Sequence, residues 1–140
     1  MEAAQKAGRT RALGVSNVSA GQLEEIWARA SVKPIYVQNR TFTRPRSDAA
    51  VRQFCAKNSI FYEGFSLLTA NPAALRHPAV VRTAKRLSKT AEQVVFRFCI
   101  QSEIVPLTGT TSQTHMAEDL AATAFTLDAE AMAAIAPLYP

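Results

Sequence analysis

One segment of the sequence combines a glycine, several threonines and the start of a helical pattern. Ile104 and Val105 form an apolar, strand-like end that leads into residues 108–111, and a helix is expected directly afterwards. A strand, a short Gly/Thr loop and a helix N-terminus bring free backbone N–H groups and the positive end of the helix dipole together, which suits a phosphate group. The same arrangement also occurs as an ordinary joint between packed elements, so this segment alone leaves both interpretations open.

Side chains that can bind a ligand also end the other strand-like runs. The four ends read Ser16-Asn17, Gln38-Asn39, Phe65-Ser66 and Leu107-Thr108. Amides and hydroxyls can hydrogen-bond a ligand, and an aromatic ring can stack on one. In a parallel barrel the carboxyl ends of the strands meet at one face, where these groups would converge. The alternative is that they satisfy turns and helix caps.

The elements that must position these groups alternate along the chain. Strand-like runs lie at residues 11–15, 34–38, 60–65 and 104–107, with helical patterns between them. The spacing of Leu23, Ile26 and Trp27 predicts an amphipathic helix, and Ser19 with Gln22 reads as its capping box. Alternating strands and helices imply a parallel sheet with right-handed crossovers.

Further capping signals divide the second half of the chain into helices. Two helices are expected between the third and fourth strands, one starting near Pro78 and one capped by Thr90. Met116 and Leu120 are expected to form an apolar stripe on one face of the helix after the Gly/Thr loop, and Asp128 is expected to cap the last helix. Four short strands among many helices suit part of a (β/α) barrel better than an open sheet. The predicted fold class is therefore α/β, a TIM-type half barrel of four parallel strands, forming a single domain over residues 1–140.

Composition limits the class of protein. A chain of 140 residues with 48% apolar and 19% charged residues is typical of one globular domain. The formal charge of +5 comes from scattered basic residues, which disfavours a nucleic-acid surface and leaves an anionic small ligand open. Cys55 and Cys99 lie in apolar helical patterns and are interpreted as buried thiols, and Arg44 and Arg46 as part of a solvated loop. Without a signal-peptide or membrane-spanning pattern, a cytoplasmic protein that does not bind membranes is expected.

Five segments, in this order, resemble the C-terminal half of the aldo-keto reductase family. They read RALGVSNVSAGQLEEI (11–26), VKPIYVQ (32–38), FYEGFSLL (61–68), KTAEQVVFRFCIQ (89–101) and VPLTGTTSQTHMAEDL (105–120). The resemblance runs from about residue 7 to residue 138. It implies strands five to eight of the family's eight-stranded barrel. It also implies that the family's catalytic Asp, Tyr, Lys and His have no counterpart in this sequence, so that the chain alone is expected to be inactive.

The resemblance carries over the part of the family that binds a nicotinamide nucleotide. Ser16 and Asn17 would hydrogen-bond the nicotinamide carboxamide, with help from Gln38. Phe65 stands where the family often has a Tyr stacked on the nicotinamide, and it keeps the flat ring while losing the hydroxyl. These four residues would orient the reactive ring.

The residues expected at the phosphate and adenosine ends of the cofactor match the family pattern less closely. By the resemblance, Ser66 and Leu68 would line the pyrophosphate region and Thr108 would contact the phosphate end. His115 falls where many members have an Arg that holds the 2′-phosphate, so NADP (as NADPH) is implied while NAD remains open. The pair expected at the adenine is Glu118 and Asp119.

Three functions remain open. The chain could be the cofactor-binding half of an NAD(P)H-dependent oxidoreductase. It could instead be a non-catalytic interaction subunit, a pseudo-enzyme, because a half barrel leaves unpaired strand edges at residues 11–15 and 104–107 that a second copy or another protein would cover. Binding of a nucleotide without turnover would make it a nucleotide sensor.

Overall fold

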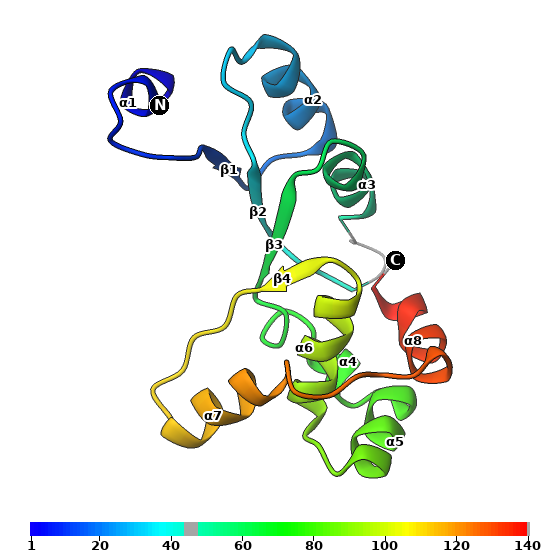
Figure 1. Cartoon of the computed structure of the whole chain (residues 1–140). Helices are drawn as coiled ribbons and strands as arrows, with labels where there is room; N and C mark the ends of the chain where they lie inside the picture. Colours follow the sequence, from blue (N-terminus) through cyan, green and yellow to red (C-terminus); the bar gives the residue numbers. More distant parts are fainter. Residues whose placement is uncertain (44–47, 140) are drawn as a thin grey trace.

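A parallel sheet forms the centre of the molecule. A computed structural model describes residues 1–43 and 48–139, and the sheet in this part of the chain contains β1 (Gly14–Ser16), β2 (Tyr36–Arg40), β3 (Phe61–Phe65) and β4 (Ile104–Pro106). Neighbouring strands pair in parallel and lie side by side in chain order, with β1 and β4 at the two edges (Figure 1). The predicted α/β class with four parallel strands and its two open edges is confirmed.

Helices make the crossovers between the strands. Helix α1 (Glu2–Lys6) precedes β1, α2 (Ala20–Arg29) joins β1 to β2, and α3 (Ala49–Lys57) joins β2 to β3. Three helices separate β3 from β4, namely α4 (Pro72–Leu75), α5 (Pro78–Leu87) and α6 (Ala91–Gln101). Helices α7 (Gln113–Ala121) and α8 (Ala129–Ile135) and a 3₁₀ turn at Ala136–Leu138 follow β4. The short α4 was not predicted. Within the described residues, every helix is too short or too polar to cross a membrane.

Local side-chain caps fix where several helices begin. The capping boxes predicted at Ser19 and Thr90 are both present, and the carboxylate of Asp128 caps α8 as predicted. His77 also caps a helix, because its Nδ1 accepts a hydrogen bond from the N–H of Ala79 at 3.3 Å at the start of α5. The imidazole therefore has a structural role there.

The first two strands begin later than predicted. Residues 11–13 approach the sheet as a loop, and a hydrogen bond from Ile35 N–H to the Leu13 carbonyl precedes the regular pairing at Gly14. Pro34 has no N–H to donate to a ladder, which is why β2 starts beyond it. The loop predicted around Arg44 and Arg46 lies outside the described residues.

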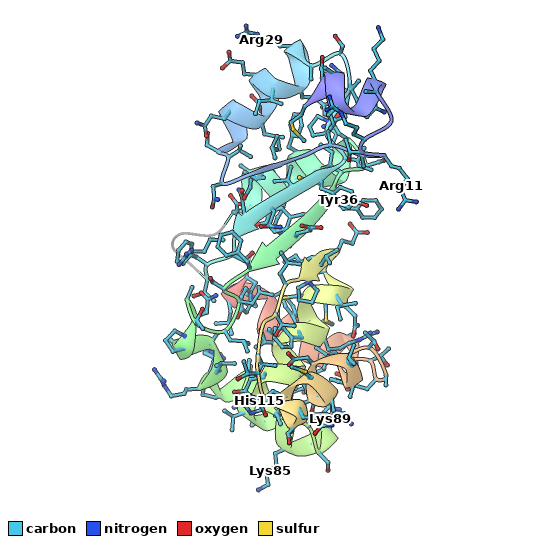
Figure 2. The ribbon with its side chains drawn as sticks, turned by 90° about the vertical axis from the view of Figure 1, so that its left-hand side faces the viewer. Arg11, Arg29, Tyr36, Lys85, Lys89 and His115 are labelled. Atoms are coloured by element: carbon cyan, nitrogen blue, oxygen red, sulfur yellow. The ribbon has the colours of Figure 1, made fainter. Side chains whose placement is uncertain are left out.

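The two faces of the sheet differ in burial. Val37, Tyr62 and Ile104 face the helices and are at most 3% exposed, and the two cysteines are buried with them as predicted. On the opposite face lies the exposed ring of Tyr36 (Figure 2), which stacks on the exposed ring of Phe61 with centroids 5.5 Å apart. Side chains on the face of Tyr36 and Phe61 are therefore the ones that a ligand or partner can reach.

Candidate functional site

The first predicted site residues lie at the carboxyl end of β1, in a turn formed by residues 16–18, here called the β1 turn. Ser16 Oγ donates a hydrogen bond to the Gln38 carbonyl at 2.8 Å, and Asn17 Nδ2 donates to Ser16 Oγ at 3.0 Å. Asn17 has a left-handed backbone with φ 55°, a conformation that Asn tolerates better than most residues. Ser16 and Asn17 are both exposed, so this polar pair is accessible at the edge of the sheet.

Gln38 lies beside this turn, on the sheet face that the helices leave uncovered. Its Nε2 donates to Glu63 Oε2 at 3.0 Å, and the register places Ser16, Gln38 and Glu63 on three adjacent strands. Glu63 was not predicted as a site residue, although the alternation of β3 puts it on the same face as Phe65. A carboxylate at this position can accept hydrogen bonds from the NH₂ group of a ligand carboxamide.

Four predicted residues come together around one small cavity at the carboxyl ends of β3 and β4. The cavity has a volume of about 340 Å³, and its lining includes Phe65, Ser66, Leu68 and Thr108. The guanidinium of Arg40 lies over the ring of Phe65 at 5.2 Å from the centroid, a contact that the sequence analysis missed. An apolar wall with hydroxyl groups and a nearby cation suits part of an anionic ligand.

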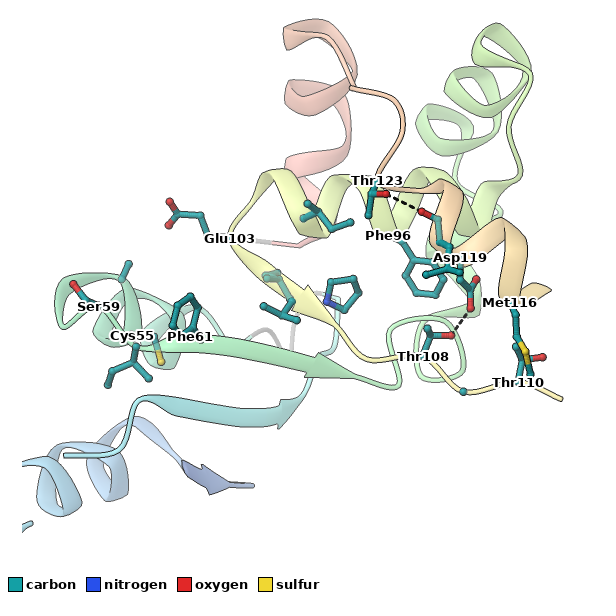
Figure 3. A pocket seen from close by; sticks show the side chains of 18 residues that line it. Cys55, Ser59, Phe61, Phe96, Glu103, Thr108, Thr110, Met116, Asp119 and Thr123 are labelled. Carbon is teal, nitrogen blue, oxygen red and sulfur yellow. Dashed lines mark hydrogen bonds between the residues drawn. The ribbon is translucent and has the colours of Figure 1, made fainter. Parts of the chain in front are cut away.

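Thr108 and Asp119 contact each other directly. The Thr108 hydroxyl donates to Asp119 Oδ2 at 2.6 Å, which ties the loop after β4 to α7 (Figure 3). The predicted phosphate contact and one predicted adenine contact are therefore neighbours. The carboxylate opposes an anion at this point, and the Thr108 proton is already engaged.

Helix α7 separates the other predicted residues. Ser112 caps it by accepting from the N–H of His115 at 3.3 Å, and the imidazole of His115 is exposed. Glu118 lines a shallow pocket against α6, whereas Asp119 lines the cavity along β4. The structure thus brings Asp119 to Thr108 but places Glu118 on a different side of the helix.

A large cavity follows the open edge of β4. It has a volume of about 1170 Å³ and extends from Cys55 and Phe61 to Thr108 (Figure 3). Met116 and Leu120, the predicted apolar stripe, line this cavity and are 47% and 75% exposed. Burial raises the pKa of the Cys55 thiol to about 11, so the thiol stays protonated at neutral pH and is not an activated nucleophile.

Comparison with known proteins identifies relatives across the whole chain. The family model described as Aldo/keto reductase family matches residues 1–140. Identity to aldo-keto reductase family 1 member A1 of Xenopus tropicalis is 25% over 147 residues, covering 99% of this chain and 45% of that protein. Identity to 7-acetyl-epi-neemfruitin B aldo-keto reductase of Melia azedarach is 32% over 127 residues, covering 86% and 39% respectively.

The solved structures agree with this result. MGS-M4, an aldo-keto reductase enzyme from a Medee basin deep-sea metagenome library, matches with a TM-score of 0.89 at 26% identity, covering 99% of this chain and 51% of that structure. The chain therefore spans about half the length of the relatives it matches.

Proposed function

Because the chain belongs to the aldo/keto reductase family, we propose that it is the nicotinamide-nucleotide-binding part of an NAD(P)H-dependent carbonyl reductase. One observation carries the proposal. Ser16 and Asn17 form a polar pair at the carboxyl end of β1, and the Ser16 hydroxyl joins this pair to the backbone carbonyl of Gln38 in the adjacent parallel strand β2. In a (β/α) barrel this is the face where ligands bind.

The residues around this group fit the parts of such a cofactor. When bound, the nicotinamide supplies a hydride for reduction of a carbonyl. The exposed hydroxyl and amide of the β1 turn bind its carboxamide, and Gln38 with Glu63 fixes the orientation of that group. Phe65 forms a flat wall, and the cavity that it lines with Ser66 and Leu68 takes the pyrophosphate region. The Thr108 hydroxyl, which Asp119 holds, would have to leave that carboxylate to contact a phosphate.

The proposal separates binding from chemistry. The resemblance implies that the family's catalytic Asp, Tyr, Lys and His have no counterpart in this sequence, and the proposal is therefore that the chain alone binds the cofactor without transferring hydride at a useful rate. Binding without turnover is also the property expected of a nucleotide sensor. NADPH is the proposed cofactor from the family, with NADH as the alternative because His115 replaces the usual Arg.

A titration of the 140-residue chain with NADPH and NADH, followed by cofactor fluorescence, tests the proposal. Saturable binding is expected, and Asn17→Ala or Gln38→Ala weakens it by about tenfold, as expected for a lost hydrogen bond. Asn58→Ala is the matched control, since Asn58 bonds the Phe54 carbonyl at the end of α3. A well-folded sample that binds neither cofactor, or an equal effect of all three substitutions, contradicts the proposal.

The uncovered face of the sheet favours a second candidate, a non-catalytic interaction subunit that pairs with a second copy of itself. A two-fold axis along the strands would place β4 of one copy beside β1 of the other. Two sheets of four parallel strands would then close into eight, the number found in TIM-type barrels. Arg11 precedes β1 and Glu103 precedes β4, and these exposed, opposite charges would meet at the joint.

A further inference from the structure

Asn39 follows Gln38 in β2, but its side chain lies on the helix-facing side of the sheet and is only 5% exposed. The Asn39 amide binds both backbone groups of Val18. Val18 N–H donates to Asn39 Oδ1 at 3.0 Å, and Asn39 Nδ2 donates to the Val18 carbonyl at 2.7 Å. Val18 directly follows Asn17. A single side chain therefore extends the pairing of β1 with β2 beyond the end of the backbone ladder.

The orientation of this amide is fixed by a third hydrogen bond. Asn39 Nδ2 also donates to Asp48 Oδ2 at 2.7 Å, and the hydroxyl of Tyr62 donates to the same oxygen at 2.8 Å. Both N–H groups of Asn39 and its oxygen are thus paired. If the amide were flipped, its NH₂ group would face the N–H of Val18 and its oxygen would face the Asp48 carboxylate, and neither pair could form a hydrogen bond. Only one orientation therefore satisfies all partners.

Asp48 holds the Asn39 amide in place instead of capping a helix. It occupies the N-cap position of α3, where Asp is a preferred residue, yet its side chain makes no cap hydrogen bond. Its carboxylate accepts from Asn39 and Tyr62 instead. Burial, and secondarily the charge of Asp48, raises the pKa of Tyr62, which keeps the hydroxyl protonated as a donor.

The β1 turn needs such external support. Its central residue, Asn17, has a left-handed backbone, which costs free energy in any residue except glycine. We infer that Asn39 is a positioning residue, which holds the β1 turn so that Ser16 and Asn17 present their polar groups to the nicotinamide end of the cofactor. This inference rests on the proposed function, and it assigns Asn39 no contact with the cofactor itself.

The chain offers a matched control in Asn71. This asparagine is 2% exposed and also binds backbone groups, since it accepts from Thr43 N–H at 2.7 Å and donates to the carbonyls of Thr41 and Leu67 at 2.8 and 2.9 Å. These bonds join the loop after β2 to the loop after β3, and none of them involves the β1 turn. Asn71→Leu therefore removes a comparable set of buried hydrogen bonds without touching Val18.

The test measures the two ends of the cofactor separately. Asn39→Leu is expected to weaken binding of reduced nicotinamide mononucleotide by about tenfold, as for a lost buried hydrogen bond, and binding of adenosine 2′,5′-bisphosphate by less than about twofold. Asn71→Leu is expected to leave the ratio of the two affinities unchanged. The exchanged pair Asn39→Asp with Asp48→Asn keeps the Val18 N–H bond and a contact between positions 39 and 48, and is expected to recover part of the nicotinamide affinity.

Amide hydrogen exchange supplies a readout that needs no ligand. In Asn39→Leu the Val18 amide is expected to exchange at least about tenfold faster, relative to the Leu23 amide in the same protein. If Asn39→Leu does not fold, Asn39→Ala, which also removes both hydrogen bonds to Val18, carries the same comparison. The inference is overturned if the exchange rate of the Val18 amide is unchanged in Asn39→Leu. It is also overturned if the substitution weakens the binding of both cofactor halves equally. If the unaltered chain binds neither half, the proposed function fails, and exchange alone decides whether Asn39 holds the turn.

Discussion

At position 115, where the proposed function expects a contact with the 2′-phosphate of NADPH, the chain carries an imidazole. The His115 side chain is exposed in the first turn of α7, whose N-terminus carries the positive end of the helix dipole. His115→Arg is expected to raise the ratio of NADPH to NADH affinity by about tenfold, because Arg is always charged and forms paired hydrogen bonds to phosphate. Fluorescence titration with both cofactors measures this ratio.

The control for this substitution adds the same charge on another side of α7. Thr114 is exposed and lines the shallow pocket with Glu118. Thr114→Arg should leave the ratio nearly unchanged. If the ratio of NADPH to NADH affinity rose equally in both variants, the added charge would act at a distance. Position 115 would then make no specific contact with the 2′-phosphate.

The sequence indicates which residue types end the strands more reliably than it indicates the face on which each lies. Ser16, Asn17 and Gln38 are connected by hydrogen bonds, although Gln38 lies in the middle of β2 and not at its end. Arg40 was missed because the predicted strand stopped at Gln38, two residues short of the observed end. With the correct boundary, alternation would have placed Arg40 with Gln38 on one face and Asn39 on the other.

An ion pair joins two helices that are distant in sequence. Arg86 at the end of α5 donates to Asp128 Oδ2 at 2.6 Å, while Asp128 Oδ1 caps α8 by accepting from Ala131 N–H. The Arg86 hydrogen bond, followed by the Ala131 N–H, lowers the pKa of Asp128 below its ordinary value of 3.8. The carboxylate therefore stabilises the fold fully above that value, and this stabilisation is lost as the pH falls through the lower pKa of the folded protein.

Asp128→Asn is expected to lower the melting temperature at pH 7 by no more than about 3 °C, because both partners are exposed and Asn still caps a helix. The difference from the unaltered chain should close as the pH falls below about 4. Thermal melts between pH 3 and pH 8 measure it. Glu130→Gln, which changes another exposed acid in the first turn of α8, is the control. A difference that persists unchanged at low pH would assign the effect to cap geometry instead of charge.

Helix caps were predictable because they depend on residues three apart in sequence. Ser19, Thr90 and Asp128 all cap the expected helices. The stripe of Met116 and Leu120 shows the opposite limit. Amphipathic spacing identifies an apolar face but does not identify what covers it, and here that face borders the cavity along β4.

At the scale of the whole molecule, the uncovered sheet face is the surface that the second candidate function assigns to a second copy of the chain. If a second copy covers it, the chain is dimeric, and Phe61→Glu shifts it toward monomer by placing a charge beside Tyr36 in the joined faces. The dimer dissociation constant is expected to rise by at least about tenfold. Light scattering over a range of concentrations measures the shift.

Two further comparisons make this test specific. Val81→Glu alters an exposed apolar residue of α5 that lies away from the sheet face, and should not change the dissociation constant. Arg11→Glu or Glu103→Arg alone should weaken association, and combining the two should restore it. A monodisperse monomer with a cooperative melt would exclude the second copy as the occupant of this face.

The order of the strands in space is also their order in the chain, and this has a consequence during synthesis. A nascent chain leaves the ribosome with its amino end first, and β1 emerges before β2, β2 before β3 and β3 before β4. Each strand therefore pairs with the one that emerged just before it, across the single crossover that connects them (Figure 1). Once β2 has emerged and paired with β1, each later strand of the described sheet finds its neighbour already in place, so the sheet can assemble in step with translation.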